Sequence, residues 1–438
     1  MTFERLSDPS LWQRQVERYE QLGQRAWSEG LVPWRITTCP WVAHVEADLI
    51  EAFASAHPGP LTVWDVGAGT GRLAFHLATE LERRGVTATL LLTDVARENV
   101  IAWRSQPQLK ALREAGKLTL GVMNVLTDDL PRDLDTEAPL EVGPCVVLAH
   151  YLFDSLPCSA WRRVAGEVQE GWVSLAGEAV QWEWRAPTTE PPALRSDAPH
   201  LFPQGAIEAT RRIAAACDNT FLLLIIDKGA NTHPTLARHE TLSAGVDFEA
   251  VRESFPALHW QSTEPSPVLQ LAAISSEPLT TPLPDPWSLR RALEQVASDA
   301  STLRELVTRQ HVLHDDPDTL AQMADQAHAL LPTASLPEVE ALVAAIARAA
   351  DRHFLFRQTL DVPFTLGALA HAAGALRLAE ALYLLSLTES GEKPGTLYNL
   401  ALICRATERS SEAIQLLKHT LSLDPGHTKS LSLLSTLG

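Results

Sequence analysis

The first part of the chain alternates short apolar runs with longer stretches of helical spacing. The apolar runs predict strands over residues 61–66, 87–93, 117–123, 144–149 and 219–227, with later strands near 257–262 and 267–275. Helical spacing predicts helices over residues 71–84, 97–115 and 151–156. Because strands and helices alternate, we predict an α/β fold with a parallel, Rossmann-like sheet and right-handed crossovers.

Two segments depart from this alternation. Residues 1–60 are predicted to be helical, with a break near Val32 and Pro33 and a helix over residues 41–54. Residues 160–204 show strand-like alternation and then a proline-rich stretch, which predicts an antiparallel β insertion and a loop. The insertion either packs its tryptophans onto the sheet or lines an acceptor pocket with them: Trp161, Trp172, Trp182 and Trp184.

The last third of the chain is rich in alanine and leucine and follows a proline-rich linker over residues 278–286. We predict an all-α domain over residues 287–438. From about residue 360, small and apolar residues recur at a spacing of 34, as in the pairs Leu366 and Leu400, and Ala379 and Ala413. This period resembles the tetratricopeptide repeat. The repeats either stack on the α/β domain or bind a peptide on their concave face.

Length and composition limit the class of protein. A chain of 438 residues exceeds one compact core, and we expect an α/β domain over residues 61–277 between the helical segments. The net charge of −18 disfavours nucleic acid and membrane surfaces as partners.

No basic, apolar leader begins the chain, and the five cysteines form no CxxC motif, so we expect a reduced, cytoplasmic compartment. His233, His239 and Glu240 lack the spacing of a metal site, and no metal is expected. The oligomeric state stays open.

The most specific motif lies where the first predicted strand meets the first predicted helix. There Gly67, Gly69 and Gly71 follow Asp65, a turn that lets a ligand approach the backbone and the helix N-terminus. Asp94 ends the next strand, at a position suited to accepting hydrogen bonds from both ribose hydroxyls. The third strand ends at Asn124, whose amide can contact an adenine edge.

This arrangement resembles the class I S-adenosylmethionine-dependent methyltransferases. The resemblance implies S-adenosyl-L-methionine as cofactor and a binding set of Asp65, Gly67, Ala68, Gly69, Gly71, Asp94, Val95, Asn124 and Val125. Upstream, Arg35 and Thr38 either fold over the donor, with the guanidinium on its carboxylate, or belong to a structural surface turn. Dinucleotide-binding Rossmann enzymes, which carry GxGxxG without the leading acid, and a tight turn without ligand are the alternatives.

A second segment narrows the resemblance. Residues 149–157 are similar to the segment after the fourth strand in the MidA-type protein arginine methyltransferases, the mitochondrial complex I assembly-factor family. Asp154 and Pro157 match that family's pattern, whereas His150 replaces an asparagine and Tyr151 a glutamate. Lys228 replaces a tyrosine in a later motif, and the likeness covers about residues 30–275. Tyr151 cannot supply the carboxylate that arginine methylation needs, so the resemblance implies the fold more than the substrate.

The segment after the fourth strand also holds the candidate catalytic residues. His150 suits a general base, Tyr151 can stack on or hydrogen-bond the acceptor, and Asp154 can orient His150 or attract a cation. Alternatively, His150 bonds a backbone group and Tyr151 packs. We expect methyl transfer to a peptide or protein side chain, with the helical repeats contributing to its recognition. The alternatives are a small-metabolite methyltransferase and a non-catalytic scaffold acting through its repeats.

Overall fold

The computed structural model describes residues 2–32, 35–175, 179–229, 235–236, 241–266, 269–284, 299–356 and 360–437. The chain divides into two compact units, Met1–Pro286 and Trp287–Gly438, and each is described by itself. The boundary falls at the end of the proline-rich segment 278–286. In the described residues, no helix combines the length and the apolar character that crossing a membrane requires.

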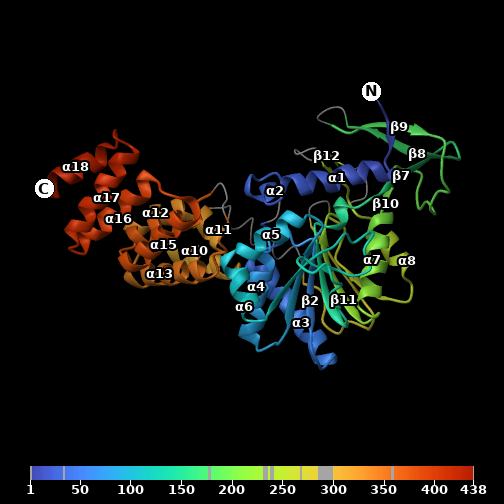
Figure 1. Cartoon of the computed structure of the whole chain (residues 1–438), viewed down its shortest axis with the longest axis horizontal. Coiled ribbons are helices and arrows are strands. Elements are labelled where there is room, and N and C mark those ends of the chain that lie inside the picture. Colours follow the sequence, from blue (N-terminus) through green and yellow to red (C-terminus); the bar gives the residue numbers. More distant parts are fainter. Residues whose placement is uncertain are drawn as a thin grey trace. The chain divides into compact units, whose positions relative to one another are not determined.

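The first unit is built on a mixed sheet whose centre is parallel (Figure 1). β2 lies between β3 and β6, so that Trp64 is opposite both Leu91 and Val147. The antiparallel strands lie at the two margins. In sheet order the strands are β14 (His259–Ser262), β15 (Gln270–Ser275), β11 (Phe221–Asp227), β6 (Cys145–His150), β2 (Thr62–Val66), β3 (Thr89–Asp94), β4 (Leu118–Val122) and β5 (Arg132–Asp133). The predicted α/β sheet is thus confirmed, with antiparallel strands added at its edges.

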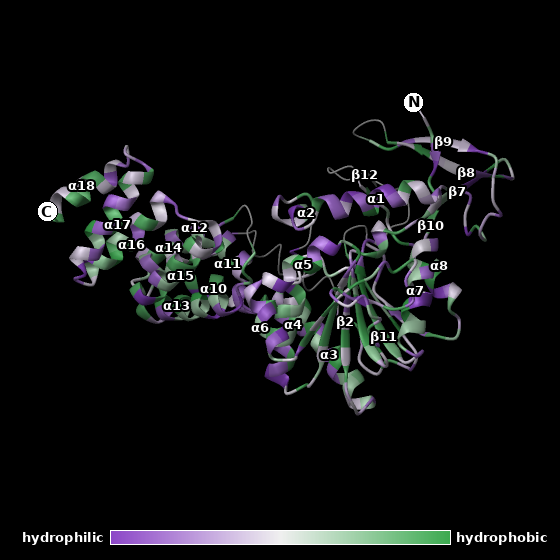
Figure 2. Ribbon diagram, viewed as in Figure 1, coloured by the Kyte–Doolittle hydropathy of each residue, from purple (hydrophilic) through white to green (hydrophobic). Residues whose placement is uncertain are grey.

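Helices cover the sheet because its strands are apolar on both faces, as Figure 2 shows for β2 and β11. One face packs on Ile213 of α7 and Val251 of α8 through alternate strand residues, among them Trp64 and Leu223. The helices that follow or precede the strands are α3 (Pro40–Ala56), α4 (Arg72–Arg84), α5 (Arg97–Ser105), α6 (Pro107–Glu114), α7 (Gln204–Ala216) and α8 (Phe248–Ser254).

Two predicted helices differ in the structure. The helix expected over residues 97–115 is two helices, because Gln106 has extended backbone and its side chain accepts a hydrogen bond of 2.8 Å from the Leu109 amide, while Pro107 begins α6. The helix expected over residues 151–156 is a single 3₁₀ turn, η1 (Phe153–Ser155).

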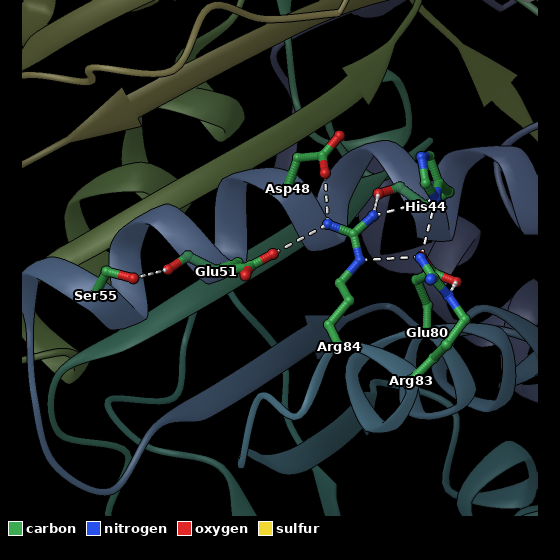
Figure 3. Close-up of polar contacts among 7 residues, drawn as sticks. All are labelled: His44, Asp48, Glu51, Ser55, Glu80, Arg83 and Arg84. Carbon is green, nitrogen blue, oxygen red and sulfur yellow. Dashed lines mark hydrogen bonds and ion pairs between the residues drawn. The ribbon is translucent and has the colours of Figure 1, made fainter.

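A polar network joins α3 to α4 (Figure 3). Buried Glu80 accepts hydrogen bonds from Arg83 at 2.6 Å and Arg84 at 2.9 Å, and lies 2.9 Å from His44 Nδ1. Arg84 continues the network to Asp48 on α3. Burial works against the charge of Glu80, but the hydrogen bonds from Arg83, Arg84 and His44 hold its pKa well below the ordinary value. The network fixes α3, the helix that carries Glu46.

A smaller antiparallel sheet contains the insertion. It consists of β1 (Glu4–Arg5), β7 (Ser159–Val164), β8 (Glu167–Ser174), β9 (Gln181–Arg185) and β10 (His200–Phe202). The expectation that residues 1–60 are wholly helical is wrong at β1, which pairs with β8 through Glu4 and Val173. The remaining described elements near this sheet are α1 (Pro9–Leu22), α2 (Arg25–Ser28), β12 (Thr235–Leu236) and β13 (Leu242–Ser243). The break expected near Val32 is followed by Pro33, which lies outside the described residues.

The second unit is helical throughout its described residues. Its first part holds α10 (Leu303–Val312), α11 (Pro317–Gln322), α12 (Ala324–Leu330), η2 (Leu331–Thr333) and α13 (Leu336–Asp351). Its second part holds α14 (Val362–Ala372), α15 (Leu376–Ser390), α16 (Pro394–Ala406), α17 (Ser410–Leu423) and α18 (Thr428–Leu437). Of the residues that repeat at the predicted period, Ala379 and Ala413 are both fully buried. Small residues therefore stand where neighbouring helices approach closely.

Candidate active site

A pocket of about 310 Å³ lies at the carboxyl ends of the parallel strands. α1 crosses this edge of the sheet and forms one wall of the pocket (Figure 1). The α1 residues in the wall recur at helical spacing and are mostly apolar or aromatic: Pro9, Trp12, Gln13, Gln15, Val16 and Tyr19. The opposite walls come from the ends of β2, β3, β4 and β6. This is the place where open α/β sheets bind their ligands.

The glycine turn after β2 forms the floor of one end. Gly67 and Gly69 line the pocket with backbone φ angles of 73° and 54°, a conformation that side chains rarely adopt. A Cβ on Gly69 would come within 2.8 Å of the Trp27 ring, so α2 packs directly on the turn. The Gly69 carbonyl also accepts hydrogen bonds from Gln24 at 2.9 Å and Trp103 at 3.0 Å. The turn is therefore held from two sides.

Gly71 has a different place from the other two glycines. It lies outside the pocket lining and forms the left-handed N-cap of α4. A Cβ there would come within 2.8 Å of Leu109 Cδ1. The lack of a side chain at Gly71 serves packing against α6, and its contact with the ligand stays a prediction. Ala68 does line the pocket.

Two buried carboxylates, Asp65 and Asp94, face the pocket. Asp94 accepts hydrogen bonds from the Gly69 amide at 3.1 Å and the Ala96 amide at 2.9 Å. Burial raises its pKa to about 6 against the effect of these bonds. Asp65 has no hydrogen bond to a side chain among the described residues, and burial raises its pKa to about 7. A cationic group in the pocket would restore the charge of Asp65.

The remaining predicted binding residues divide into two groups. Val95, Asn124, Val125 and Thr38 line the pocket. The Asn124 amide oxygen already accepts a hydrogen bond of 3.0 Å from the Leu126 amide, so its NH₂ group is the part suited to a ligand. Arg35 does not line the pocket, which agrees with the alternative of a surface turn, and its contact with the donor carboxylate stays a prediction. The same segment presents Thr37 and Thr38 to the pocket instead.

His150 lies at the end of β6 and lines the pocket, with 6% of its side chain exposed. Its Nε2 lies 2.6 Å from Glu46 Oε1, and its Nδ1 lies 3.1 Å from the Thr37 carbonyl oxygen. Burial lowers the pKa of His150, but Glu46 and Asp65 raise it more, and the net effect is an increase. The expectation that Asp154 orients His150 is wrong, because Glu46 and Thr37 occupy both ring nitrogens.

Tyr151 and Asp154 follow His150 but face different surroundings. Tyr151 lines the pocket with a φ of 46°, a strained backbone for an aromatic residue. Asp154 lies outside the lining and accepts hydrogen bonds from Lys228 Nζ at 2.8 Å and Ser243 at 2.7 Å. The expectation that Asp154 meets an acceptor is therefore not supported. Asp227, the residue before Lys228, accepts hydrogen bonds from the Phe153 and Asp154 amides.

Comparison with known proteins indicates which reaction this pocket serves. Residues 43–244 match a family model described as "Putative S-adenosyl-L-methionine-dependent methyltransferase". These residues form an S-adenosylmethionine-dependent methyltransferase domain. The match contains β2, β3, β4 and β6 together with the glycine turn. None of the curated proteins compared matches the chain.

Solved structures were compared as well. A protein from Burkholderia thailandensis described as a "likely methyl transferase", bound to S-adenosyl-homocysteine, aligns with 16% identity and a TM-score of 0.46 over 64% of this chain and 89% of its own. An uncharacterized protein from the same organism aligns with 17% identity and a TM-score of 0.45 over the same shares. An O-methyltransferase family protein, also from that organism, aligns with 14% identity and a TM-score of 0.31 over 61% of this chain and 63% of its own. Likenesses this distant carry no argument about substrate.

The cofactor of the methyltransferase domain is S-adenosyl-L-methionine, and the pocket residues fit it. The buried Asp65 carboxylate, without a side-chain partner among the described residues, suits the donor's ammonium group. Asp94 suits the ribose hydroxyls, since its carboxylate is already oriented by two backbone amides. Gly67 and Ala68 leave room for the donor beside the turn.

Sequence reasoning missed several residues of the methyltransferase site. Trp12, Val16 and Tyr19 share one face of α1, and their spacing was a usable signal, since a helix near a ligand pocket presents such a face. Glu46 and Trp27 gave no local signal. The four insertion tryptophans do not line the pocket: Trp182 and Trp184 stack at 5.5 Å, while Arg162 and Arg185 lie over Trp184 and Trp172. Packing is therefore the correct interpretation of these rings.

His233, His239 and Glu240 lie outside the described residues. In the residues that the structure does describe, no group of three histidine, cysteine or acidic side chains has the arrangement of a metal site.

Proposed function

We propose that this methyltransferase transfers the methyl group of S-adenosylmethionine to an uncharged acceptor, which enters between α1 and the end of β6. The observation that carries the proposal is the lining of the pocket. Among the described lining residues there is no lysine, arginine or glutamate, and the ionisable groups are Asp65, Asp94, His150, Tyr19 and Tyr151. An anionic acceptor would find no cation except His150, which is paired with Glu46.

The residues that line the pocket fall into a polar group, which we assign to the donor, and an apolar or aromatic group, which we assign to the acceptor. S-adenosylmethionine, when bound, would supply a methyl group on a sulfonium: the acceptor bonds to the methyl carbon, the carbon–sulfur bond breaks, and S-adenosyl-homocysteine leaves. Asp65, Asp94 and the glycine turn line the pocket, and we assign them to the donor. Trp12, Tyr151 and Leu156 are apolar or aromatic, and we assign them to the acceptor. These walls exclude water and align the acceptor with the methyl group.

We propose further that the acceptor group belongs to a peptide or protein side chain. The second unit supports this, since its helix pairs α14–α15 and α16–α17 recur with the period of tetratricopeptide arrays, which offer peptide-binding surfaces.

A MidA-type arginine acceptor is less favoured, because Tyr151 stands in place of the glutamate and the guanidinium would need carboxylates around it. A small metabolite is the second candidate, favoured by the α1 wall over the pocket.

Transfer of a labelled methyl group tests the proposal. The full chain is incubated with S-adenosylmethionine labelled in the methyl group, in parallel with a peptide library and with a fraction of metabolites below about 1 kDa. Label in uncharged side chains of peptides supports the first candidate, and label only in metabolites supports the second. Label confined to arginine or to carboxylate groups would overturn the assignment of the acceptor end.

A further inference from the structure

The two hydrogen bonds of His150 restrict its protonation. The Thr37 carbonyl oxygen, 3.1 Å from Nδ1, can only accept, so Nδ1 carries a hydrogen. The Glu46 carboxyl lies 2.6 Å from Nε2, and in its ionised form it only accepts, so that Nε2 then carries a hydrogen too. A ring with hydrogen on both nitrogens is an imidazolium and has no lone pair with which to take a proton from an acceptor.

The surroundings favour this charged pair. The side chains of His150 and Glu46 are 6% and 4% exposed, so neither charge is balanced by bulk water. Glu46 Oε2 has no hydrogen-bond partner among the described residues, so the contact with His150 is the hydrogen bond that the structure gives this carboxyl group. The charged groups that act on His150 are Glu46 from α3 and Asp65 from β2, and both are acidic. Each of these carboxylates stabilises a cationic ring more than a neutral one.

We propose that Glu46 is a positioning residue: it holds His150 doubly protonated, so that the Nδ1–H group fixes Thr37 in the wall of the donor pocket. Thr37 is 2% exposed and lines the pocket beside Thr38, so the position of its carbonyl determines the shape of that wall. The inference rests on the proposed function for what the wall binds. It also removes His150 from the general-base role expected from the sequence.

Nuclear magnetic resonance of histidine-labelled protein tests the protonation directly. His150→Asn assigns the signals of the ring. We expect an imidazolium in the full-length wild-type chain at about pH 7.5 and a neutral ring in Glu46→Gln at the same pH. Glu51→Gln, at an exposed position of α3, serves as the matched control and leaves His150 charged. A neutral ring in the wild type, or an unchanged ring in Glu46→Gln, would overturn the proposal.

Binding of S-adenosyl-homocysteine tests the positioning. Glu46→Leu removes the partner of Nε2, and we expect at least about a tenfold loss of affinity, as for other residues that orient a ligand-contacting side chain. Glu46→Gln keeps a hydrogen-bonding group in place and should stay within about threefold of the wild type. If Glu46→Leu binds as tightly as Glu51→Gln, the positioning role is wrong. If the wild type does not bind at all, the proposed function fails, while the resonance experiment still decides the state of His150.

Discussion

Gln15 of α1 donates a hydrogen bond of 2.7 Å to the carbonyl of Ser155 and accepts one of 2.7 Å from the amide of Leu242. Gln15 is 6% exposed, so both bonds are shielded from water. They attach the helix that forms the pocket wall to the turn after β6 and to β13. One amide side chain thus joins three segments that lie far apart in the sequence.

Replacing Gln15 with alanine should weaken both the fold and donor binding. The Leu242 amide would lose its partner in a buried place, which costs about 1–3 kcal/mol in the free energy of unfolding. Chemical denaturation measures this cost, and calorimetry measures the accompanying loss of S-adenosyl-homocysteine affinity. Glu20→Ala, at an exposed position of the same helix, is the control. A Gln15→Ala variant as stable as the control would show that these bonds do not hold α1.

Asp65→Asn should separate stability from binding. The pKa of Asp65 is about 7 in the folded chain, above the ordinary 3.8, so this group stabilises the fold at low pH and loses that contribution as pH rises from about 4 to 7. The asparagine variant lacks this loss and should be more stable above pH 7, by on the order of 2–4 kcal/mol, yet bind the donor more weakly. Denaturation at acid and alkaline pH compares the two proteins. A variant less stable than the wild type at high pH would contradict a net cost of burying the Asp65 carboxylate.

The pair formed by Lys228 and Asp154 is expected to be structural. Lys228→Met removes the cation that pairs with Asp154 and leaves Asp154 beside Asp227. The pKa of Asp227 is already raised well above its usual value by burial and by the charge of Asp154. We expect the variant to lose about 1–3 kcal/mol in the free energy of unfolding. The double variant Lys228→Met, Asp154→Leu should recover part of that loss, which a double-mutant cycle quantifies. Donor affinity should stay unchanged in both, since neither side chain lines the pocket. Loss of affinity in a folded single variant would place the pair in the site.

Glu80→Gln tests the network that fixes α3 on α4 (Figure 3). The pKa of Glu80 is held below its ordinary value of 4.5, so its contribution is present above that pH and is lost as pH falls. We expect the variant to lose about 1–3 kcal/mol at neutral pH and to approach the wild type in strong acid. Glu82→Gln, exposed on the same helix, is the control. A pH-independent difference would show that the charge of Glu80 does not matter.

The sequence predicts those parts of the site that depend on neighbouring residues. The glycine turn and Asp94 follow from a short strand–turn–helix pattern, and both lie in the pocket. The partners of His150 and Asp154 could not be predicted, since Glu46 is 104 residues from His150 and Lys228 is 74 residues from Asp154. Strand β1 was missed because two residues give no period, and only pairing with β8 makes them a strand. Sequence thus predicts local geometry, whereas long-range hydrogen bonds decide the roles of the residues after β6.

Calorimetric titration with S-adenosylmethionine and S-adenosyl-homocysteine tests the central claim most directly. We predict binding by the wild-type chain and by Asp135→Asn, whose carboxylate is exposed and pairs with Arg104. Asp94→Asn should bind at least about 10–100-fold more weakly, because a charged acceptor of the ribose hydroxyls is lost. Equal affinity of Asp94→Asn and the wild type, or no binding by the wild type, would contradict the donor site described above.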